Sequence, residues 1–507
     1  MERAVTIRGC SGAARRASLL TTTTPCVPGV RWASTSSKKE RVVVLGSGWA
    51  GYALARTLSP KTTSRILISP RSHFVFTPLL ASTSVGTLEF RAAIEPVRRL
   101  GLDEFHQAWA TSVDFERKVI RVEANTTQDE AVVPTTTAAS LTRTPTAAGQ
   151  LETEPRKGEQ YEVPYDKLVM AVGCYSQTFG IEGVKEHASF LRDVGDARAI
   201  RVRVLQAFET ASLPTTSDEA RSKLLHFAVV GGGPTGIEFA AELHDLVHDD
   251  LAKLYPPQLM KHVSITVYDI APKVLPMFDR NLASYATDMF RRQGIKVKTE
   301  HSIQRIRRSE GRDSHLVLRI KEEAEEVGAG VVVWSTGLMQ NPLVSQVLGQ
   351  AVRGTNKLAK DGKTGGLITD SRLRVQLEDC RGGKETETLP SVYALGDCAV
   401  VQDANYPATA QVASQQAVYL GKQLSRSGDG GDTASPPPFK FRNWGTMAYL
   451  GSWRAIHQSS ADEIKGRAAW ILWRTAYLTK SMSIRNKILI PVYWAITWIF
   501  GRDISRF

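Results

Sequence analysis

The amino-acid sequence predicts an α/β protein with two Rossmann-type parallel sheets and a C-terminal membrane-associating helical region. Two glycine-rich loops, each between an apolar strand and a helix, indicate the two sheets, and six of the ten tryptophans lie after residue 440. The chain has 507 residues, of which 42% are hydrophobic and 23% charged, so it can bury more than one globular core. A disordered or fibrous protein is therefore excluded.

The first glycine-rich loop spans residues 46–51 and follows an apolar strand. Gly46 permits a tight turn, Gly48 lets backbone N–H groups approach a pyrophosphate, and Gly51 lets the next helix pack on the strand. The N-terminus of that helix adds positive potential. The following strand ends at Ser69, where an acidic residue normally binds the adenosine ribose, and a serine hydroxyl binds a ribose less strongly.

The same pattern returns in a second loop, which contains Gly231, Gly233 and Gly236. The next strand ends in Asp269, whose carboxylate can hold both ribose hydroxyls of NADH and repel the 2′-phosphate of NADPH. This acid follows the loop by more than the usual ~20 residues, so we expect an elongated helix or loop around residues 255–257. The duplication of the whole pattern indicates two bound dinucleotides.

A third segment, residues 392–397, is an apolar strand that ends in Gly-Asp. It resembles the segment of two-dinucleotide flavoproteins whose aspartate binds the ribityl chain of FAD, so Asp397 is expected to complete the site that Gly46 opens. Gly173 and Gly337 end two further apolar strands and resemble the glycines at the crossovers between the two domains of such proteins. We therefore expect FAD at the first loop and a pyridine nucleotide at the second.

Together these segments resemble the mitochondrial type II NADH:ubiquinone oxidoreductases, the alternative, rotenone-insensitive enzymes that pump no protons. The resemblance covers residues 40–507 and implies a glutathione-reductase-like fold. Its most specific parts are Phe76-Thr77-Pro78-Leu79-Leu80, residues 231–238, Ala410-Gln411-Val412-Ala413, residues 447–451 and residues 473–502.

The resemblance also implies which residues serve the reaction. Ala410 and Thr77 would lie at the flavin, and Gln411 would lie beside the quinone pocket. Tyr477 would lie near the quinone tunnel, and Glu238 near the contact between nicotinamide and flavin. NADH would pass a hydride to N5 of a non-covalently bound FAD, and two electrons would then pass to ubiquinone.

The net charge of +13 is concentrated at the two ends of the chain. Residues 1–39 contain seven Lys or Arg, many Ser and the single acid Glu2, and they lack the apolar run of a secretory signal. This composition predicts a mitochondrial transit peptide that is cleaved near residues 31–33. Residues 440–507 hold eleven basic and three acidic side chains. Because the body between the ends is close to neutral, no nucleic-acid partner is expected.

The C-terminal region predicts attachment to a membrane surface. Its longest uncharged apolar run, residues 488–500, has 13 residues and contains Pro491, so it is shorter than the ~20 residues that span a bilayer. Tryptophans interleaved with basic residues are typical of helices that lie in the membrane interface. The alternative, which is compatible with the first, is a helical pair that packs on the protein or on a second copy. We expect a homodimer, peripheral on the mitochondrial inner membrane, at its matrix side.

These observations predict four regions and no metal site, since no D-x-[DN]-x-[DN]-G-x₅-E loop for calcium occurs. The regions are the transit peptide (1–39), the FAD-binding domain (40–220 and 339–425, with a low-complexity insertion around 125–157), the NADH-binding domain (221–338), and a linker with the C-terminal membrane-anchoring and dimerisation region (426–507).

Two other classes of protein remain open. A sulfide:quinone oxidoreductase has the same fold but needs a redox pair of cysteines at the flavin. Cys174, Cys380 and Cys398 are widely separated in the sequence, although Cys174 and Cys398 can become neighbours in the fold. A nucleotide-binding flavoprotein of the apoptosis-inducing-factor kind is the other class, and residues 410–413 and the Trp-rich tail argue against it.

Overall fold

The structure is a computed structural model that describes residues 39–125, 158–310, 314–352, 356–378, 387–427, 437–460 and 462–506. The expected transit peptide, the insertion around 125–157, Cys380 and most of the expected linker lie outside the described residues.

The larger sheet has eleven strands in the order β23-β20-β21-β22-β8-β1-β2-β5-β6-β7, with β19 beside β21. Its centre is parallel, because β1 pairs in parallel with both β2 and β8. The strands are β1 (Glu40–Leu45), β2 (Thr63–Ser69), β5 (Glu104–Asp114), β6 (Val119–Ala124), β7 (Gln160–Pro164), β8 (Lys167–Met170), β19 (Lys357–Leu358), β20 (Leu367–Thr369), β21 (Arg374–Glu378), β22 (Glu387–Ala394) and β23 (Ala399–Val401).

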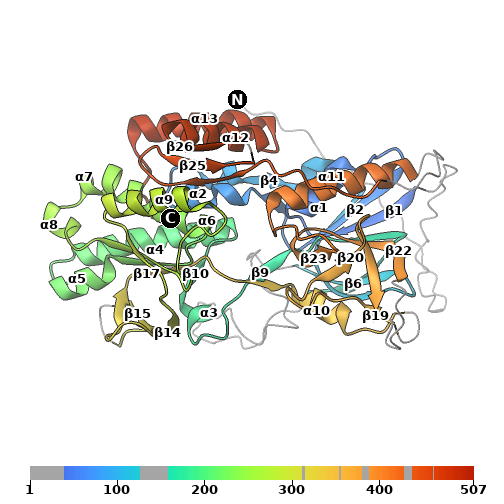
Figure 1. Ribbon diagram of the computed structural model, residues 1–507, viewed down its shortest axis with the longest axis horizontal. Helices are drawn as coiled ribbons and strands as arrows, with labels where there is room; N and C mark the ends of the chain where they lie inside the picture. Colours follow the sequence, from blue (N-terminus) through green and yellow to red (C-terminus); the bar gives the residue numbers. More distant parts are fainter. Residues whose placement is uncertain are drawn as a thin grey trace, which may run out of the picture. The chain divides into compact units, whose positions relative to one another are not determined.

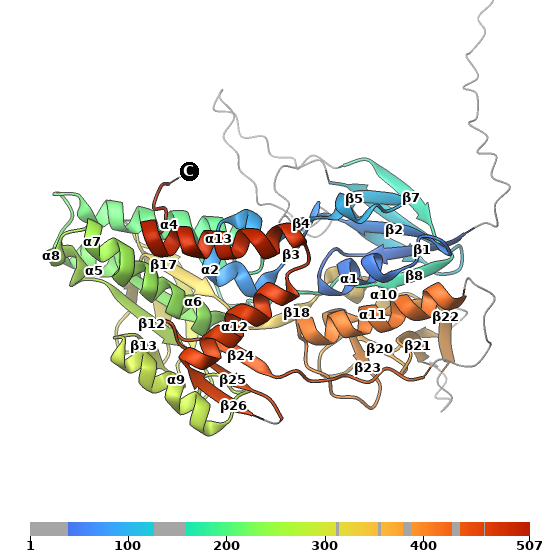
Figure 2. The ribbon, with the colours of Figure 1, turned by 90° about the horizontal axis from the view of Figure 1, so that it is seen from above.

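Two helices cover the larger sheet next to the first glycine loop. Helix α1 (Trp49–Thr57) and helix α11 (Ala410–Ser427) lie side by side in Figures 1 and 2, and Leu54 and Leu58 of the first segment share a core with Ala417 and Leu420 of the second. Apolar burial thus brings the start of α11 to the carboxyl end of β1, more than 350 residues earlier in the chain.

The second sheet is parallel throughout, in the order β10-β17-β11-β12-β13. Its strands are β10 (Ser189–Phe190), β11 (His226–Val230), β12 (Ser264–Tyr268), β13 (Lys296–Lys298) and β17 (Val331–Trp334), and its longer helices are α4 (Val194–Ser212), α5 (Asp218–Leu224), α6 (Pro234–Asp245) and α9 (Arg280–Arg292). The two Rossmann-type sheets predicted from the sequence are confirmed. Helix α6 continues as a π-helical turn, η4 (Leu246–Leu251), and then as α7 (Ala252–Leu254) and α8 (Pro257–Met260), which together form the elongated connection to β12.

Two short strands connect the sheets. Strand β9 (Cys174–Ser176) follows Gly173, strand β18 (Leu338–Gln340) follows Gly337, and the two pair antiparallel. The crossover positions expected for both glycines are thereby present. Beside the second sheet lie α3 (Val184–His187) and a small antiparallel sheet of β14 (Ile303–Arg308), β15 (Leu316–Ile320) and β16 (Val327–Ala329), whereas α10 (Pro342–Leu348) packs on the larger sheet.

The segment after β2 reaches from the first sheet to the second. It contains β3 (His73–Val75), η1 (Thr77–Leu79), α2 (Leu80–Ser84), η2 (Phe90–Ala93), β4 (Ile94–Pro96) and η3 (Val97–Leu100). Leu80 and Val85 belong to the same hydrophobic core as Ile200 of α4 and Ile237 of α6. The residues Phe76 to Leu80 therefore lie between the two glycine-loop units.

The C-terminal region packs on this junction. It consists of the antiparallel strands β24 (Thr446–Tyr449), β25 (Ala455–Gln458) and β26 (Glu463–Gly466) and the helices α12 (Arg467–Lys480) and α13 (Ile484–Phe500), which Figure 1 shows above α2 and α6. The buried Asn486 of α13 donates from Nδ2 to the carbonyl oxygens of Ala92 (3.2 Å) and Ile94 (3.1 Å). Within the described residues, no helix combines the length and the apolar character that crossing a bilayer requires.

Candidate active site

The first glycine loop has the geometry that a dinucleotide needs. Gly46 adopts φ = 103°, a left-handed conformation open to glycine, and a Cβ there would overlap the carbonyl oxygen of Ala171. A Cβ on Gly51 would overlap the carbonyl oxygen of Gly46. By contrast, no atom lies within 4 Å of the Cβ position of Gly48, so the middle of the loop faces open space.

The second glycine loop repeats this geometry. Gly231 adopts φ = 116°, and a Cβ there would lie 2.8 Å from the Ser335 hydroxyl oxygen. A Cβ on Gly236 would overlap the carbonyl oxygen of Gly231, whereas Gly233 again has no atom within 4 Å of its Cβ position. In both loops the first and third glycines close the turn, and the second leaves room for a pyrophosphate at a helix N-terminus.

The acid after the second loop lies at the carboxyl end of β12, as the sequence predicts. The Asp269 carboxylate accepts hydrogen bonds from the backbone N–H groups of Gly232 and of Ala271, the latter at 2.7 Å. Each oxygen thus holds one backbone donor and keeps lone pairs for further donors. The carboxylate therefore lies against the loop in the place where ribose hydroxyls would reach it.

Ser69, at the equivalent place after the first loop, has different surroundings. It is 2% exposed, and its Oγ lies 2.8 Å from Oγ of Ser47 and accepts the backbone N–H of Arg71 at 3.2 Å. The hydroxyl is thus already used to fasten the end of β2 to the glycine loop. Thr77 also lies at this loop, because its Oγ1 accepts Nε1–H of Trp49 at 3.0 Å.

Asp397 follows β22 in the short helix η5 (Gly396–Cys398), beside the crossover that starts at Gly173. The thiol of Cys174 donates to Asp397 Oδ2 at 3.1 Å, and the side-chain amide of Gln340 on β18 donates to the Asp397 carbonyl oxygen at 3.3 Å. The aspartate is therefore held by both crossover strands. Near it, the hydroxyl oxygen of Ser414 in α11 is buried and has no hydrogen-bond partner among the described residues, as expected where a polar ligand would complete the site.

The cysteines here do not form a redox pair. Cys174 and Cys398 are both free thiols, and among the described residues no disulfide occurs. Burial raises the pKa of Cys174 to about 11 and that of Cys398 to about 12, so both remain protonated at neutral pH. Because the thiolate is the reactive form of cysteine, these groups are poorly suited to the chemistry of a sulfide:quinone oxidoreductase.

Glu238 lies in the second turn of α6 (Pro234–Asp245) and is 7% exposed. Its Oε1 accepts the backbone N–H of Tyr449 and Nε1–H of Trp473, both at 3.1 Å. Burial raises the pKa of Glu238 to about 8, so the carboxyl retains its proton at neutral pH. The ring of Trp473 lies 4.8 Å from the ring of Tyr477, which in turn lies 6.2 Å from Phe76. Glu238 and Tyr477 therefore lie close together, since both contact Trp473.

Gln411, in the first turn of α11 beside Ala410, holds the start of the C-terminal region. Its Nε2 donates to the carbonyl oxygen of Gly445 at 2.7 Å, and its Oε1 accepts the backbone N–H of Trp444 at 3.2 Å. These residues lead directly into β24, whose last residue bonds to Glu238. Gln411 and Glu238 thus fasten the two ends of one short segment, residues 444–449.

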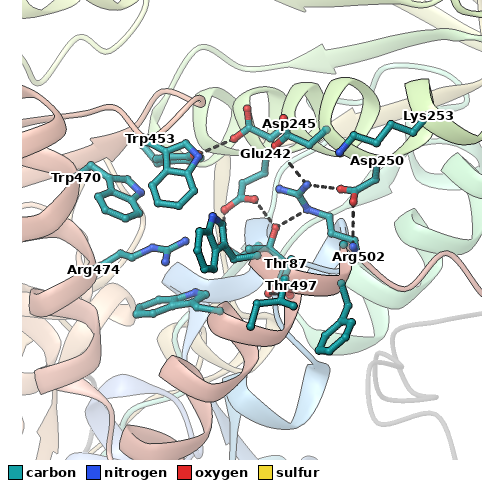
Figure 3. Close-up of a pocket in the computed structure, with 18 of the residues that line it drawn as sticks. Thr87, Glu242, Asp245, Asp250, Lys253, Trp453, Trp470, Arg474, Thr497 and Arg502 are labelled. Atoms are coloured by element: carbon teal, nitrogen blue, oxygen red, sulfur yellow. Dashed lines mark hydrogen bonds and ion pairs between the residues drawn. The ribbon is translucent and has the colours of Figure 1, made fainter.

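The sequence analysis missed two acids that lie behind Glu238 on α6. Glu242 and Asp245 are each 4% exposed and border a cavity of about 500 Å³ between α6, α12 and α13 (Figure 3). A signal was available, because residues 238, 242, 245 and 249 are acidic and recur at intervals of four, three and four. Such spacing places side chains on one face of a helix.

The two nucleotide loops, the crossover strands and the Gly-Asp segment define the class of protein: a flavin-dependent oxidoreductase with two dinucleotide sites. The family model "Pyridine nucleotide-disulphide oxidoreductase" matches residues 40–417, and the model "NDH2 C-terminal domain" matches residues 444–503. The chain belongs to the first family and, within it, to the type II NADH dehydrogenases.

Individual relatives agree with this assignment. The chain is 37% identical to a probable NADH dehydrogenase of Dictyostelium discoideum, over 93% of this chain and 92% of the relative. It is 34% identical to the internal alternative NAD(P)H-ubiquinone oxidoreductase A1, mitochondrial, of Solanum tuberosum, over 94% and 89%. The structure of NDH2 from Plasmodium falciparum in complex with NADH superposes with a TM-score of 0.77 at 23% identity, over 92% of this chain and 100% of that one, which shows the shared fold.

The open middle glycines lead to a first prediction. Gly48→Ala and Gly233→Ala each leave the fold stable, since the added methyl group meets no protein atom and both residues have φ near −75°. The methyl groups instead occupy space needed by a pyrophosphate. We expect about a tenfold or greater loss of affinity, for flavin in the first variant and for NADH in the second, measured by equilibrium binding and checked by thermal melting. Gly362→Ala, which also meets open space but lies in neither loop, is the matched control and changes neither affinity.

Proposed function

We propose that this chain is an FAD-containing, non-proton-pumping NADH:ubiquinone oxidoreductase of the mitochondrial inner membrane. The observation that carries the proposal is the position of residues 444–449. At one end Gln411 holds this segment at the start of α11, and at the other Glu238 holds it at the second glycine loop. The start of the region that matches the NDH2 C-terminal domain therefore connects the two nucleotide-binding units.

The residues present fit two dinucleotides. The residues that would hold FAD are Gly46, Gly48, Gly51, Ser69, Thr77, Gly173, Asp397 and Ala410, and those that would hold NADH are Gly231, Gly233, Gly236, Asp269 and Gly337. The support is the open space at both middle glycines and the unpartnered hydroxyl of Ser414. FAD, when bound, supplies a centre that accepts a hydride and releases two electrons. The chain itself would orient both ligands and keep water away from the contact between nicotinamide and flavin.

The quinone would bind along residues 444–449, between Gln411 at one end and Glu238 with Tyr477 at the other. Tyr477 packs against Trp473 and faces Phe76, so the wall of this site is aromatic. The side-chain amide of Gln411 is fully used in holding residues 444 and 445, which gives it a positioning role. Glu238 carries a proton at neutral pH and is the one carboxyl group among the three, with a pKa near the working pH of a general acid.

The proposed activity is tested with purified protein reconstituted with FAD. We expect flavin absorbance of about one non-covalent FAD per chain and steady-state oxidation of NADH with a soluble short-chain ubiquinone. NADH oxidation without quinone reduction would favour a nucleotide-binding flavoprotein instead. Quinone reduction that requires sulfide in place of NADH would favour a sulfide:quinone oxidoreductase.

The position of Asp269 predicts a preference for NADH over NADPH. Asp269→Asn keeps an oxygen that can accept the Gly232 N–H but removes the negative charge that repels a 2′-phosphate. We expect the ratio of kcat/KM for NADH over NADPH to fall by about ten- to a hundredfold, because a hydrogen bond to a charged group contributes ~1.5–3 kcal/mol. The KM for quinone serves as the control and stays the same. Equal use of both nucleotides by the unmodified enzyme would show that the acid does not meet the ribose.

We further propose that α13 lies on the lipid surface. Every fourth residue along one side of this helix is apolar and exposed: Ile484 (78%), Ile488 (60%), Val492 (45%) and Ile496 (45%). Trp498 (73%) and Phe500 (81%) extend this surface at the end of the helix. Lys480, Arg485 and Lys487 lie in the same region and would meet anionic headgroups. The homodimer expected from the sequence also remains proposed, with a second copy of the chain covering part of this surface.

Replacement of apolar residues on α13 tests this attachment. Ile488→Asn combined with Ile496→Asn removes two side chains whose burial is each worth ~1.5–3 kcal/mol. We expect flotation with inner-membrane-like vesicles to weaken by at least about tenfold, at low and at high salt, because apolar burial is not screened. Ile270→Asn removes an isoleucine that is more exposed (71%) than either of these but lies outside the C-terminal region, and it leaves flotation unchanged. Binding that only salt abolishes would refute apolar attachment.

The matrix side remains the proposed orientation. It rests on the composition of residues 1–39, which predicts import, and on the absence of a stop-transfer run in residues 33–45 of the sequence. Protease added to intact mitoplasts is expected to leave the catalytic body undigested. Its digestion would place the enzyme in the intermembrane space.

A further inference from the structure

Three carboxyl groups are buried on one face of α6, although burial of acids is costly unless they are hydrogen-bonded. Glu238, Glu242 and Asp245 are 7%, 4% and 4% exposed, respectively. Asp249, one turn further on in η4, is 60% exposed at its side chain. The row therefore runs from the surface of the protein to the proposed quinone site.

Each buried acid has its own partners from distant parts of the chain. Glu242 accepts hydrogen bonds from the hydroxyl groups of Ser82 (2.6 Å) and Thr87 (2.7 Å). Asp245 accepts the hydroxyl of Tyr449 at 2.6 Å. Since the backbone N–H of Tyr449 donates to Glu238, this one residue contacts the first and the third acid of the row.

The cavity of about 500 Å³ gives the row access to solvent. Glu242, Asp245 and the exposed Asp249 all line it, and Figure 3 shows Glu242 and Asp245 pointing into it from α6. Arg474 enters from α12 and lies 4.4 and 4.2 Å from the ring centroids of Trp470 and Trp494. Its Nε–H is buried and has no hydrogen-bond partner in the described part of the chain. A polar cavity of this size with an unpaired donor holds water.

Burial raises the pKa of Glu242 and favours its protonated form, although charges of both signs face this carboxyl. On its own element it faces Glu238 and Asp245, and Tyr449 of β24 lies beside it. Two cations face it, Arg502 from the C-terminus and Arg474 from α12. Burial raises the pKa of Glu242 more strongly than these cations lower it.

Further charges border the cavity at a greater distance: Asp250, which pairs with Arg502 at 2.6 Å, and Asp249 and Lys253 near the opening. Of the two acids with a raised pKa, Glu238 and Glu242, Glu242 is the one that lines the cavity and can exchange a proton with water there. A carboxyl in such a place can lose a proton to a neighbour and regain one from water.

The proposed reaction requires such a route, and the inference rests on that function. NADH gives two electrons and one proton as a hydride, whereas a quinol carries two electrons and two protons. Each turnover therefore takes one proton from water. We propose that Glu242 relays this proton from water in the cavity to Glu238, one helical turn away, which delivers it to the quinone. The proton bound to Glu242 is then replaced from the cavity.

The relay is tested with Glu242→Gln, which keeps the shape of the side chain and an acceptor for Ser82 or Thr87 but cannot release a proton. Two acceptors are compared: a short-chain ubiquinone, whose reduction consumes protons, and ferricyanide, whose reduction consumes none. We expect NADH:ferricyanide activity within about twofold of the unmodified enzyme and a fall in quinone reduction on the order of a hundredfold. The solvent deuterium isotope effect on quinone reduction is expected to rise.

Glu242→Asp and Asp288→Asn complete the set. The aspartate variant restores an acid and is expected to recover part of the quinone activity together with its pH dependence, which also covers the case in which the glutamine variant fails to fold. Asp288 is a half-exposed acid on α9 paired with Arg291, and its replacement by asparagine leaves both activities unchanged. In the unmodified enzyme, quinone reduction should fall above about pH 8, where Glu238 loses its proton, while ferricyanide reduction does not.

Three outcomes overturn the relay. Unchanged quinone reduction in the glutamine variant would show that the proton takes another route. An equal loss with both acceptors in the glutamine variant, without recovery in the aspartate variant, would show a purely structural role. An unmodified enzyme that reduces ferricyanide and no quinone would refute the proposed function itself, and with it the need for the proton.

Discussion

The two hydrogen bonds that Glu238 accepts from Tyr449 and Trp473 hold the C-terminal region to the helix behind the second nucleotide loop. They satisfy a carboxyl that would otherwise be buried without partners, so the helix and the C-terminal strands can bury apolar surface together only if these bonds form. The same packing places Tyr477 against Phe76 and, through Gln411, closes the junction between the two sheets.

The junction is polar inside and apolar outside. Its interior contains Glu242, the buried ion pair of Arg502 with Asp250, and the guanidinium of Arg474 between tryptophan rings. Its outer face is the row of exposed isoleucines on α13. Isolated buried charges usually add little stability compared with apolar residues of the same size. Their concentration around the cavity beside Glu242 is consistent with a role in moving protons.

Elements with a local signal could be predicted from the sequence. The glycine loops, the crossover glycines 173 and 337 and the long connection from Gly236 to Asp269 all depend on residues close together in the chain, and the structure contains them. Glu238 and Gln411 came from the family resemblance, which carried no information about their partners. Ser69 lay at the expected strand end, but its hydroxyl is used by Ser47, a contact that requires the folded loop.

Glu242 and Asp245 could not be assigned a role from sequence for a physical reason. An acidic residue every three or four positions on a helix usually marks a solvated face. In the structure this face of the helix is buried instead. It is covered by α2, β24 and the C-terminal residues, which come from segments more than 150 residues away in either direction. Only the folded chain shows that this polar stripe lies inside.

The bonds to Glu238 also bear on how the chain acquires its structure. The partners of this carboxyl lie 211 and 235 residues further along the chain, and those of Glu242 lie 160 and 155 residues before it. A growing polypeptide can therefore assemble the parallel sheets early, but Glu238 has no partners until the last eighth of the chain arrives. Contacts so distant in sequence form slowly, since the entropy of closing a long loop is lost before they reward it. Until the C-terminus docks, the apolar surface that it covers stays exposed, and such surface makes an incompletely folded chain prone to aggregation.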